Sequence, residues 1–365
     1  MNPRRKDLLV QALRDLDCVF SDESRWDELI RRAREADLLG TIAHRLEMAG
    51  RLHDVPAAPR MHLRSAGTLC AAQHRAVMRE VREIAHAVAP LGIPIVLLKG
   101  AAYLVAELPP ACGRLFSDVD ILIPKAALPE VEATLMLAGY ATTHDNPYDQ
   151  RYYRRWMHEL PPMQHIRRMT VLDVHHAIVP QTARVQSDAD ALLKSAVRLP
   201  RHPGISVLAP SDMVLHSATH LFHNEEFTHG LRDLVDIHEL LRHFSSDPGF
   251  WSGLLSRAEE LNLARPLYYA FVWSTRLLGT EIPREIIEHA DRHAPSMPVR
   301  AVMDCLLAQA MQPTAREAPT RWSRRALYVR GHWLKMSFWL LTWHLAVKTF
   351  RRNEPATAPV PPPHP

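Results

Sequence analysis

Apolar residues at spacings of three and four dominate the first part of the chain. Over residues 4–50, leucines and isoleucines recur at these spacings with Arg, Glu and Asp between them, which is the pattern of amphipathic helices. Pro56 and Pro59 interrupt the pattern, and a second helix is predicted over residues 60–89, before Gly92. These features predict an N-terminal helical region over residues 1–90, with a packing role ahead of the core.

Between residues 91 and 180, helical periodicity alternates with short apolar runs that are typical of strands. Strands are predicted at residues 95–98, 116–123 and 167–174, and helices at residues 101–108 and 125–138. Gly139 is expected to end the second helix in the left-handed conformation. Residues 144–164 are polar and aromatic with little periodicity, which predicts a loop or irregular helix over the functional site of this α/β core.

After Pro180 the pattern is helical again, and residues 181–318 are predicted to form a C-terminal helical domain. The helices of this domain are expected at residues 187–196, 213–224, 231–244, 251–262, 266–278 and 298–310. The fold class predicted for the whole chain is α+β, with a small mixed sheet flanked by two helical regions.

Residues 319–352 combine aromatic and basic side chains. The uncharged stretch at residues 336–347 contains Phe338, Trp339 and Trp343, and Arg and Lys flank it on both sides. It is shorter than the roughly 20 residues of a transmembrane helix. It suits an interfacial helix that contacts a membrane or a partner protein, and a helix packed on the protein itself is the alternative. Residues 353–365 are Pro-rich and are predicted to be disordered.

Composition narrows the function classes only slightly. The chain of 365 residues has a formal net charge of +4 and a sequence pI near 8.9, which permits a nucleic-acid or anionic-lipid partner without requiring one. The four cysteines lack CxxC spacing, so a disulfide framework and a cysteine zinc site are not expected. No signal-peptide pattern is present, and a cytoplasmic location is expected, with a position at the inner face of the membrane as the alternative.

Two carboxylates stand out in the second predicted strand. Asp118 and Asp120 alternate with apolar residues, so both side chains would point to the same face of the strand. Adjacent carboxylates repel each other, and the commonest reason for them to coexist is a divalent cation with oxygen ligands, usually Mg²⁺.

The order of the motifs resembles the DNA polymerase β-like nucleotidyltransferase superfamily. Leu98-Lys99-Gly100, then Arg114 and Ser117–Ile123, then Leu172–His175 look like the branch of uncharacterised bacterial nucleotidyltransferases with "LKG", "R…DxDLL" and "DxH". Residues 215–241 resemble the helical part of that branch, so the similarity spans roughly residues 93–241. The pattern also implies a third carboxylate, which Asp173 supplies.

The resemblance implies transfer of an NMP from an NTP by a two-metal mechanism, with Mg²⁺ as the cofactor and Mn²⁺ as an alternative. Asp118 and Asp120 would bind both metals, and Asp173 would bind the metal nearest the acceptor. The residues implied in nucleotide binding are Lys99, Gly100, Ala101, Arg114 and Ser117. Ala101 occupies the position where the superfamily usually has a serine that contacts phosphate.

Alternatives remain for two of these nucleotide-binding residues. Gly100 would let the backbone approach a phosphate at a helix N-terminus, and Lys99 could add charge there, or it could be a surface lysine at a strand end. Arg114 could reach a phosphate, or it could form a structural ion pair.

The 22 histidines suggest further candidates. His175 would share a strand face with Asp173 and could support a metal-bound carboxylate or contact substrate. His216, His220 and His223 have helical spacing that would suit zinc, but the HExxH pattern is absent and the carboxylates make zinc redundant. Better candidates for the cleft between core and helical domain are His220, Arg232, Asp233 and Asp236, with interhelical hydrogen bonding as the alternative.

The sequence does not identify the acceptor of the NMP. RNA, a protein and a small molecule all fit, and Arg151, Arg154, Arg155, Arg167 and Arg168 would suit an RNA backbone, a triphosphate or a solvated face. One rival hypothesis is a catalytically silent nucleotide-binding or scaffold protein, which the absent serine at Ala101 favours. A second rival places function in the aromatic-basic segment, as an anchor at a membrane or on a partner.

Overall fold

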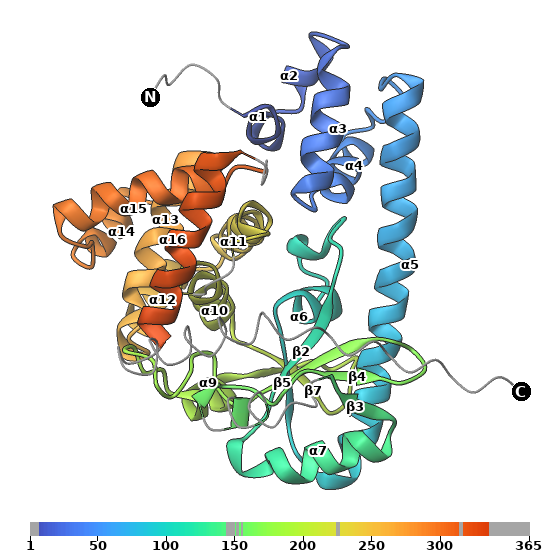
Figure 1. Ribbon diagram of the computed structural model, residues 1–365, viewed down its shortest axis with the longest axis vertical. Helices are drawn as coiled ribbons and strands as arrows, with labels where there is room; N and C mark the ends of the chain where they lie inside the picture. The colour runs from blue at the N-terminus through green and yellow to red at the C-terminus, as the bar shows by residue number, and fades with distance from the viewer. Residues whose placement is uncertain are drawn as a thin grey trace, which may run out of the picture.

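The computed structural model describes residues 7–143, 150, 153–154, 156–223, 227–313 and 317–335. Its centre is one mixed seven-stranded sheet, with helices on both faces (Figure 1). The helix α7 (Leu128–Leu137) lies on one side of the sheet, and α6 (Lys99–Val105) lies on the other with the C-terminal helices beyond it. The predicted α+β class, a mixed sheet between two helical regions, is confirmed.

The sheet has the order β3-β4-β5-β2-β1-β7-β6. Its strands are β1 (Ile95–Leu98), β2 (Asp118–Leu122), β3 (Tyr140–Thr142), β4 (Met163–His165), β5 (Val171–His175), β6 (Val197–Arg198) and β7 (Ile205–Val207). β1 runs antiparallel to β2 and parallel to β7, and β2 runs parallel to β5. Every residue of β1 is buried, as expected for a central strand covered on both faces.

The three central strands, β1, β2 and β5, correspond to the predicted strands, and the outer strands had no predicted counterpart. The predicted third strand at 167–174 begins late, because residues 167–170 form a turn in which Met169 has a φ of 58°. β4 includes two residues of the segment predicted as a loop. β6 and β7 fall inside residues 181–318, which were predicted to be helical, and β7 completes the sheet beside β1.

The described part of residues 4–50 is helical as predicted, and it forms four separate helices. They are α1 (Leu8–Arg14), α2 (Asp17–Phe20), α3 (Arg25–Glu35) and α4 (Leu39–Met48). Asp37 ends α3 in the left-handed conformation, with a φ of 56°, and the Leu38 amide donates to the carbonyl of Ala33. The chain therefore turns sharply and packs α4 against the next helix.

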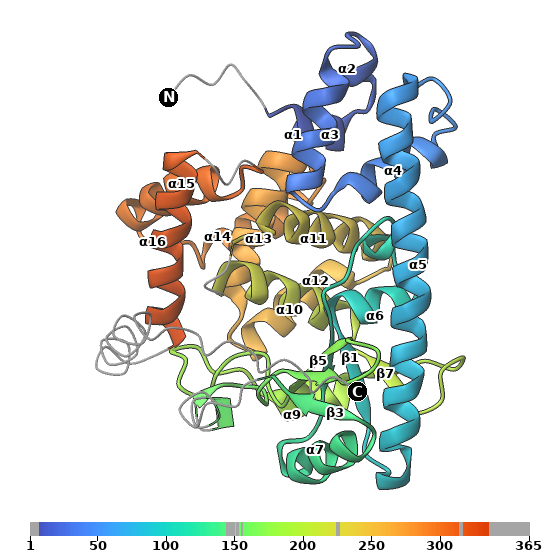
Figure 2. The same cartoon turned by 45° about the vertical axis from the view of Figure 1, so that its right-hand side comes forward.

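The long helix α5 (Ala57–Val88) joins the N-terminal helices to the sheet (Figures 1 and 2). It begins before the predicted residue 60, because Pro59 falls in its first turn, where a missing amide proton costs nothing. It contacts α4, α6 and α7. Short 3₁₀ helices follow α5 along the chain: η1 (Ala89–Leu91), η2 (Pro109–Ala111) and η3 (Lys125–Ala127). Gly139 has a φ of 96°, as predicted for the end of α7.

A buried carboxylate fastens α5 to the sheet edge. Glu80 is 1% exposed, and its Oε2 accepts from the Arg168 Nε at 2.6 Å. The Tyr140 hydroxyl donates to the same carboxylate. Burial alone would raise the pKa of Glu80, but the hydrogen bonds from Arg168 and Tyr140 outweigh burial and lower that pKa.

Glu80→Gln is therefore expected to reduce the free energy of unfolding by about 2 kcal/mol at pH 7, the range for a charged hydrogen bond. Because the folded-state pKa of Glu80 lies below its usual value, this contribution is present above about pH 4.3 and is lost as the pH falls through the lowered pKa. Urea unfolding at pH 7 and at acid pH measures both effects. A difference between wild type and variant that stays constant with pH would contradict this account.

The helices after the sheet core match most of the predictions. They are α9 (Ala189–Ser195), α10 (Pro210–His223), α11 (Gly230–Phe244), α12 (Phe250–Glu260), α13 (Ala264–Leu278), α14 (Arg284–Asp291), α15 (Met297–Ala310) and α16 (Ala318–Lys335). Only α14 had no predicted counterpart. α10 and α11 stack above the sheet between α5 and α16 (Figure 2).

The aromatic-basic segment is only partly described. Its residues 319–335 lie in α16, and residues 336–352, with the uncharged stretch and its aromatic anchors, lie outside the described residues, as does the Pro-rich tail at 353–365. Across the described helices, none combines the length and the apolarity needed to cross a bilayer.

Candidate active site

The register of two parallel strands sets the arrangement of the predicted carboxylates. Asp120 of β2 lies directly beside Asp173 of β5, and Asp118 lies two pairs earlier, beside Val171. Because paired residues of parallel strands share a face, the three carboxylates lie on one side of the sheet. Asp120 is buried at 3% exposure, whereas Asp118 and Asp173 are partly exposed.

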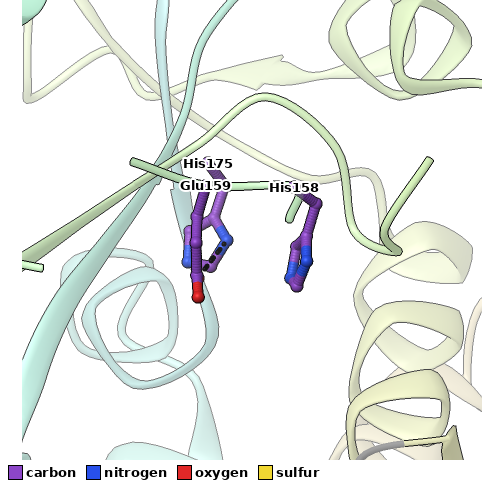
Figure 3. A group of neighbouring side chains, drawn as sticks. All are labelled: His158, Glu159 and His175. Carbon is purple, nitrogen blue, oxygen red and sulfur yellow. Dashed lines mark ion pairs between the residues drawn. The ribbon is translucent and has the colours of Figure 1, made fainter. Parts of the chain in front are cut away.

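Asp120 is held by the ammonium of Lys99 and the ring of His175. The Lys99 Nζ lies 3.2 Å from its Oδ1, and the His175 Nε2 lies 2.9 Å from the same oxygen. The other ring nitrogen of His175 lies 3.2 Å from the Glu159 carboxylate. Figure 3 shows His175 and Glu159 against each other, with the ring of His158 beside them. The imidazole thus bridges two carboxylates, which fixes its ring orientation.

The protonation of the site follows from burial and mutual charge. Burial alone would raise the pKa of Asp120, but Lys99 and His175 outweigh it and hold that pKa well below its usual range. Burial, and then the charge of Asp120, raise the pKa of Asp118. The same two causes raise the pKa of Asp173 to about 7. The site therefore concentrates negative charge that a cation would relieve.

One atom of this cluster lacks a partner. The Asp173 Oδ1 is buried and has no hydrogen bond within the described part of the chain. A buried oxygen without a partner is costly, so an orphaned carboxylate oxygen beside two more carboxylates fits an oxygen-coordinated divalent cation. These residues fit Mg²⁺ by donor type.

Other groups of metal donors also occur in the described residues. Two bring one ligand atom each within 4.8 Å of one another: His158, Glu159 and His175, and on the surface Glu259, His289 and His293. Asp118, Asp120 and Asp173 do not form so close a group among the described residues, and Lys99 and His175 already contact the Asp120 Oδ1. His216, His220 and His223 do not form such a group among the described residues, so the zinc alternative gains no support.

The turn between β1 and α6 is unusual at Lys99, which adopts the left-handed conformation with a φ of 44°. This conformation is strained for a residue with a side chain. Lys99 is not a surface lysine, since its side chain is only 20% exposed and its ammonium contacts Asp120. The left-handed turn directs the Lys99 ammonium toward the Asp120 carboxylate.

Two substitutions separate the strain of Lys99 from its charge. Lys99→Ala keeps the strain and removes the ammonium, whereas Lys99→Gly removes both. Lys99→Gly is expected to be more stable than Lys99→Ala by about 1 kcal/mol, the cost of the left-handed conformation for a residue with a Cβ. Thermal unfolding of both variants measures the difference, and equal melting temperatures would show that the turn relaxes without cost.

Gly100 is needed for packing. A Cβ at this position would lie 2.4 Å from the Arg114 Nη1 and 2.5 Å from the Phe116 ring. Ala101 is 1% exposed and does not line the cavities described below. Ser117 donates its hydroxyl proton to the Asp118 Oδ1 at 2.9 Å. The turn therefore places Lys99 and Gly100 at the site and leaves Ala101 in the core.

Arg114 forms a structural ion pair, which was one of its two predicted roles. Its Nε donates to the Asp236 Oδ2 at 3.0 Å, and both side chains are less than 10% exposed. Burial lowers the pKa of the Arg114 guanidinium, but Asp236 outweighs burial and raises it. Burial raises the pKa of Asp236 to about 6, against the opposing charge of Arg114. The pair joins the segment before β2 to α11.

Charged side chains from α10 and α11 border the site. The Arg232 Nη2 lies 3.0 Å from the Asp233 Oδ1, and the His220 Nδ1 lies 3.8 Å from the Asp233 Oδ2. Asp37, at the end of α3, lies 2.9 Å from the His229 Nδ1, so the N-terminal helices also reach this border. Burial, and then the charge of Lys99, lower the pKa of His220 well below its usual value, which favours the neutral ring.

Two adjoining cavities meet at the carboxylates and share Lys99, Asp118, Asp120 and His220. The first, called here the α11 lobe, is lined further by Gly100, Arg114, Ser117, Arg232, Asp233 and Asp236. The second, called here the α16 lobe, is lined further by Asp173, His175, Glu159, His158, the segment 178–185 and Lys335. The structure thus brings the predicted site residues, Ala101 excepted, around two connected spaces.

Glu159, His158 and Lys335 line the site but were not predicted from the sequence. Glu159 and His158 fall in the segment predicted to lie over the site, but no motif distinguishes them. Lys335 is distant in sequence and reaches the site only because α16 folds back onto the segment 178–185. Of the arginines proposed for RNA, Arg154 and Arg168 form ion pairs with Glu132 and Glu80, and Arg151 and Arg155 lie outside the described residues.

A family model described as "Uncharacterised nucleotidyltransferase" matches residues 22–279, which include the sheet and both border helices. No curated protein and no solved structure matches the chain.

Proposed function

Because the chain belongs to the uncharacterised nucleotidyltransferase family, we propose that it transfers an NMP from an NTP to an acceptor with the help of Mg²⁺. The observation that carries this proposal is the register of β2 and β5. It sets Asp173, with its orphaned oxygen, beside Asp120 at the junction of two cavities. Nucleotidyl transfer needs two spaces that meet at the carboxylates, one for the NTP and one for the acceptor.

The reaction forms a bond from an acceptor oxygen to the α-phosphorus and breaks the bond from that phosphorus to pyrophosphate, and the acceptor proton leaves. Asp118, Asp120 and Asp173 would hold divalent cations, which supply shielding of the phosphate charge and activation of the acceptor. Lys99 and His175 keep Asp120 ionised. The Glu159 carboxylate contacts the second ring nitrogen of His175, Nδ1, and thereby orients the ring.

The α11 lobe suits the triphosphate. Lys99, Arg114 and Arg232 bring positive charge to it, and Ser117 stands at its edge beside Asp118. Arg114 and Arg232 are each paired with a carboxylate of α11, and each guanidinium has five N–H donors, more than one carboxylate can accept. The α16 lobe contains Asp173, the carboxylate that the resemblance assigns to the acceptor side, so it suits the acceptor.

The test is transfer of label from each α-³²P-labelled NTP, with Mg²⁺ or Mn²⁺, to a cell lysate of the source organism as acceptor pool. Wild type is expected to transfer label, and Asp118→Ala/Asp120→Ala is not. Asp27→Ala, an exposed carboxylate on α3, is the matched control and is expected to behave as wild type. Equal labelling by wild type and the double variant would overturn the assignment of the site. NTP binding without transfer would favour the silent nucleotide-binding protein.

A further inference from the structure

A second group of metal donors adjoins the three carboxylates. Glu159 lies opposite His175 in an antiparallel bridge, so the two side chains extend from the same face of the sheet. The His176 amide donates to the His158 carbonyl at 2.8 Å, which holds the neighbouring residue of the same segment against the end of β5. The backbone therefore sets Glu159 and His175 side by side.

The distances within this group suit a metal ion. The His175 Nδ1 lies 3.2 Å from the Glu159 Oε2. Two ligand atoms of one tetrahedral zinc ion lie roughly 3.3 Å apart, because each bond is about 2.0–2.2 Å long. One ligand atom each of His158, Glu159 and His175 lies within 4.8 Å of the other two, and Figure 3 shows the His158 ring beside the other side chains. The His158 ring has to move toward the other two for all three to bind one ion.

The His158 ring has a nitrogen that needs a partner. Its Nδ1 is buried and has no hydrogen bond within the described part of the chain. A buried ring nitrogen without a partner is costly, and no hydrogen bond at this atom opposes a movement of the ring. In the tautomer with its proton on Nε2, the Nδ1 has a lone pair that a metal ion can accept. A metal ion would thus satisfy this nitrogen.

The charge around the group favours a cation. All three donors line the α16 lobe. Among its described lining residues, the lobe has four carboxylates and two lysines: Asp118, Asp120, Glu159 and Asp173, and Lys99 and Lys335. Charges attract or repel each other more strongly in a partly buried cavity than in water, so this excess of carboxylates favours a cation and opposes an anion.

His175 links this group to the carboxylates of the candidate active site. Its Nε2 lies 2.9 Å from the Asp120 Oδ1. With a metal ion on Nδ1, the ring would carry its proton on Nε2 and donate it to Asp120. A metal-bound histidine whose second nitrogen donates to a carboxylate is a common arrangement in metal sites. Two imidazoles and one carboxylate are typical ligands of Zn²⁺, whereas Mg²⁺ prefers oxygen ligands alone.

We propose that His158, Glu159 and His175 form a second metal site that binds Zn²⁺, and that this ion positions His175 against Asp120. The site is separate from the proposed Mg²⁺ site, and zinc binding does not depend on the proposed nucleotidyl transfer. Three protein ligands leave a fourth position for water from the α16 lobe. The ion would also tie the segment that contains His158 and Glu159 to β5.

The first measurement is titration of metal-free protein with Zn²⁺ in a calorimeter. Every protein carries His289→Gln, which removes the surface group of Glu259, His289 and His293. The parent protein is expected to bind one zinc ion, and added His158→Gln is expected to raise the Kd about 100-fold or more, because loss of a supporting hydrogen bond alone costs about 10–100-fold. The matched control is His53→Gln, which changes an exposed histidine and is expected to leave the Kd unchanged.

Two further variants decide which residues hold the ion. Glu159→Gln keeps the shape of the side chain and is expected to weaken zinc binding as His158→Gln does, so a folding defect in one variant does not decide the result. Asp173→Asn is expected to bind zinc far more tightly than either. Unchanged affinity in both His158→Gln and Glu159→Gln, or no zinc binding by the parent protein, would overturn the inference. Loss of affinity in Asp173→Asn alone would assign the zinc to the carboxylates and overturn it as well.

Nitrogen-15 NMR of histidine-labelled protein tests the link to Asp120. When Zn²⁺ binds, the His175 Nδ1 is expected to give the signal of a metal-bound nitrogen, and Nε2 is expected to keep its proton. His175→Gln assigns the signals. A His175 ring that keeps protons on both nitrogens in the presence of Zn²⁺ would overturn its role as a ligand. Neither measurement uses an NTP, so a failure of the proposed function and a failure of this inference are distinguishable.

Discussion

Asp173→Asn is expected to reduce NMP transfer about 10³-fold or more and, in the absence of metal, to raise the thermal stability of the protein. Transfer falls because the orphaned Oδ1 of Asp173 is the oxygen expected to meet a cation, whose charge stabilisation is several kcal/mol, and each 1.4 kcal/mol is a factor of ten. Stability rises because Asn removes a charge that burial, Asp120 and Glu159 oppose.

The pH dependence of this stability gain has a definite sign. The pKa of Asp173 is raised to about 7, so its ionisation destabilises the folded state increasingly between the usual pKa of an aspartate, about 3.9, and pH 7. The gain from Asn is therefore largest above pH 7 and disappears below about pH 4. Thermal unfolding in EDTA across this range, beside transfer assays with Mg²⁺, measures both effects. A variant that lost activity and stability together would point to a structural role for Asp173.

Asp236→Ala is expected to lower the free energy of unfolding by about 3–5 kcal/mol, the cost of leaving a buried charge without its partner. The Arg114 guanidinium would remain buried and charged, because Arg does not lose its proton in proteins. Arg114→Met is expected to cost less. The pKa of Asp236 is already raised to about 6 by burial, so this carboxyl can take up a proton when the guanidinium is absent.

The double variant Arg114→Met/Asp236→Leu provides the control for this pair. It removes both charges, so it is expected to be more stable than Asp236→Ala. Urea unfolding of the three variants gives the order directly. Asp236→Ala and Arg114→Met are expected to differ, because only the first leaves a buried charge without its partner. Equal losses in the free energy of unfolding for these two variants would contradict this account.

The centre of the site could be predicted from sequence because its signals are local. Alternation of carboxylates with apolar residues places Asp118 and Asp120 on one face of one strand, and Asp173 has the same pattern in the strand that pairs with them. Lys99 was found by its position in a motif. The contact of Lys99 with Asp120 could not be predicted, because it depends on a left-handed turn that no sequence motif indicates.

The rest of the site depends on tertiary structure. Glu159 reaches His175 from a segment without periodicity, and Lys335 reaches the α16 lobe through helix-end hydrogen bonds to Thr182 and Arg184. β7 is only three residues long, too short for an alternating pattern to distinguish it from a loop. Gly100 was assigned to phosphate contact from its motif, and its need in packing, where a Cβ would collide with Arg114 and Phe116, depends on the tertiary structure.

The parallel pairing of β1 with β7 has a consequence for how the chain is made. Ile95 pairs with Ile205, so one edge of β1 remains open during synthesis until more than a hundred further residues have left the ribosome. An open apolar strand edge is a template for pairing with other chains, and contacts so distant in sequence form slowly. Nascent chains that stall before residue 205 are therefore expected to aggregate, whereas chains that include β7 can close the sheet.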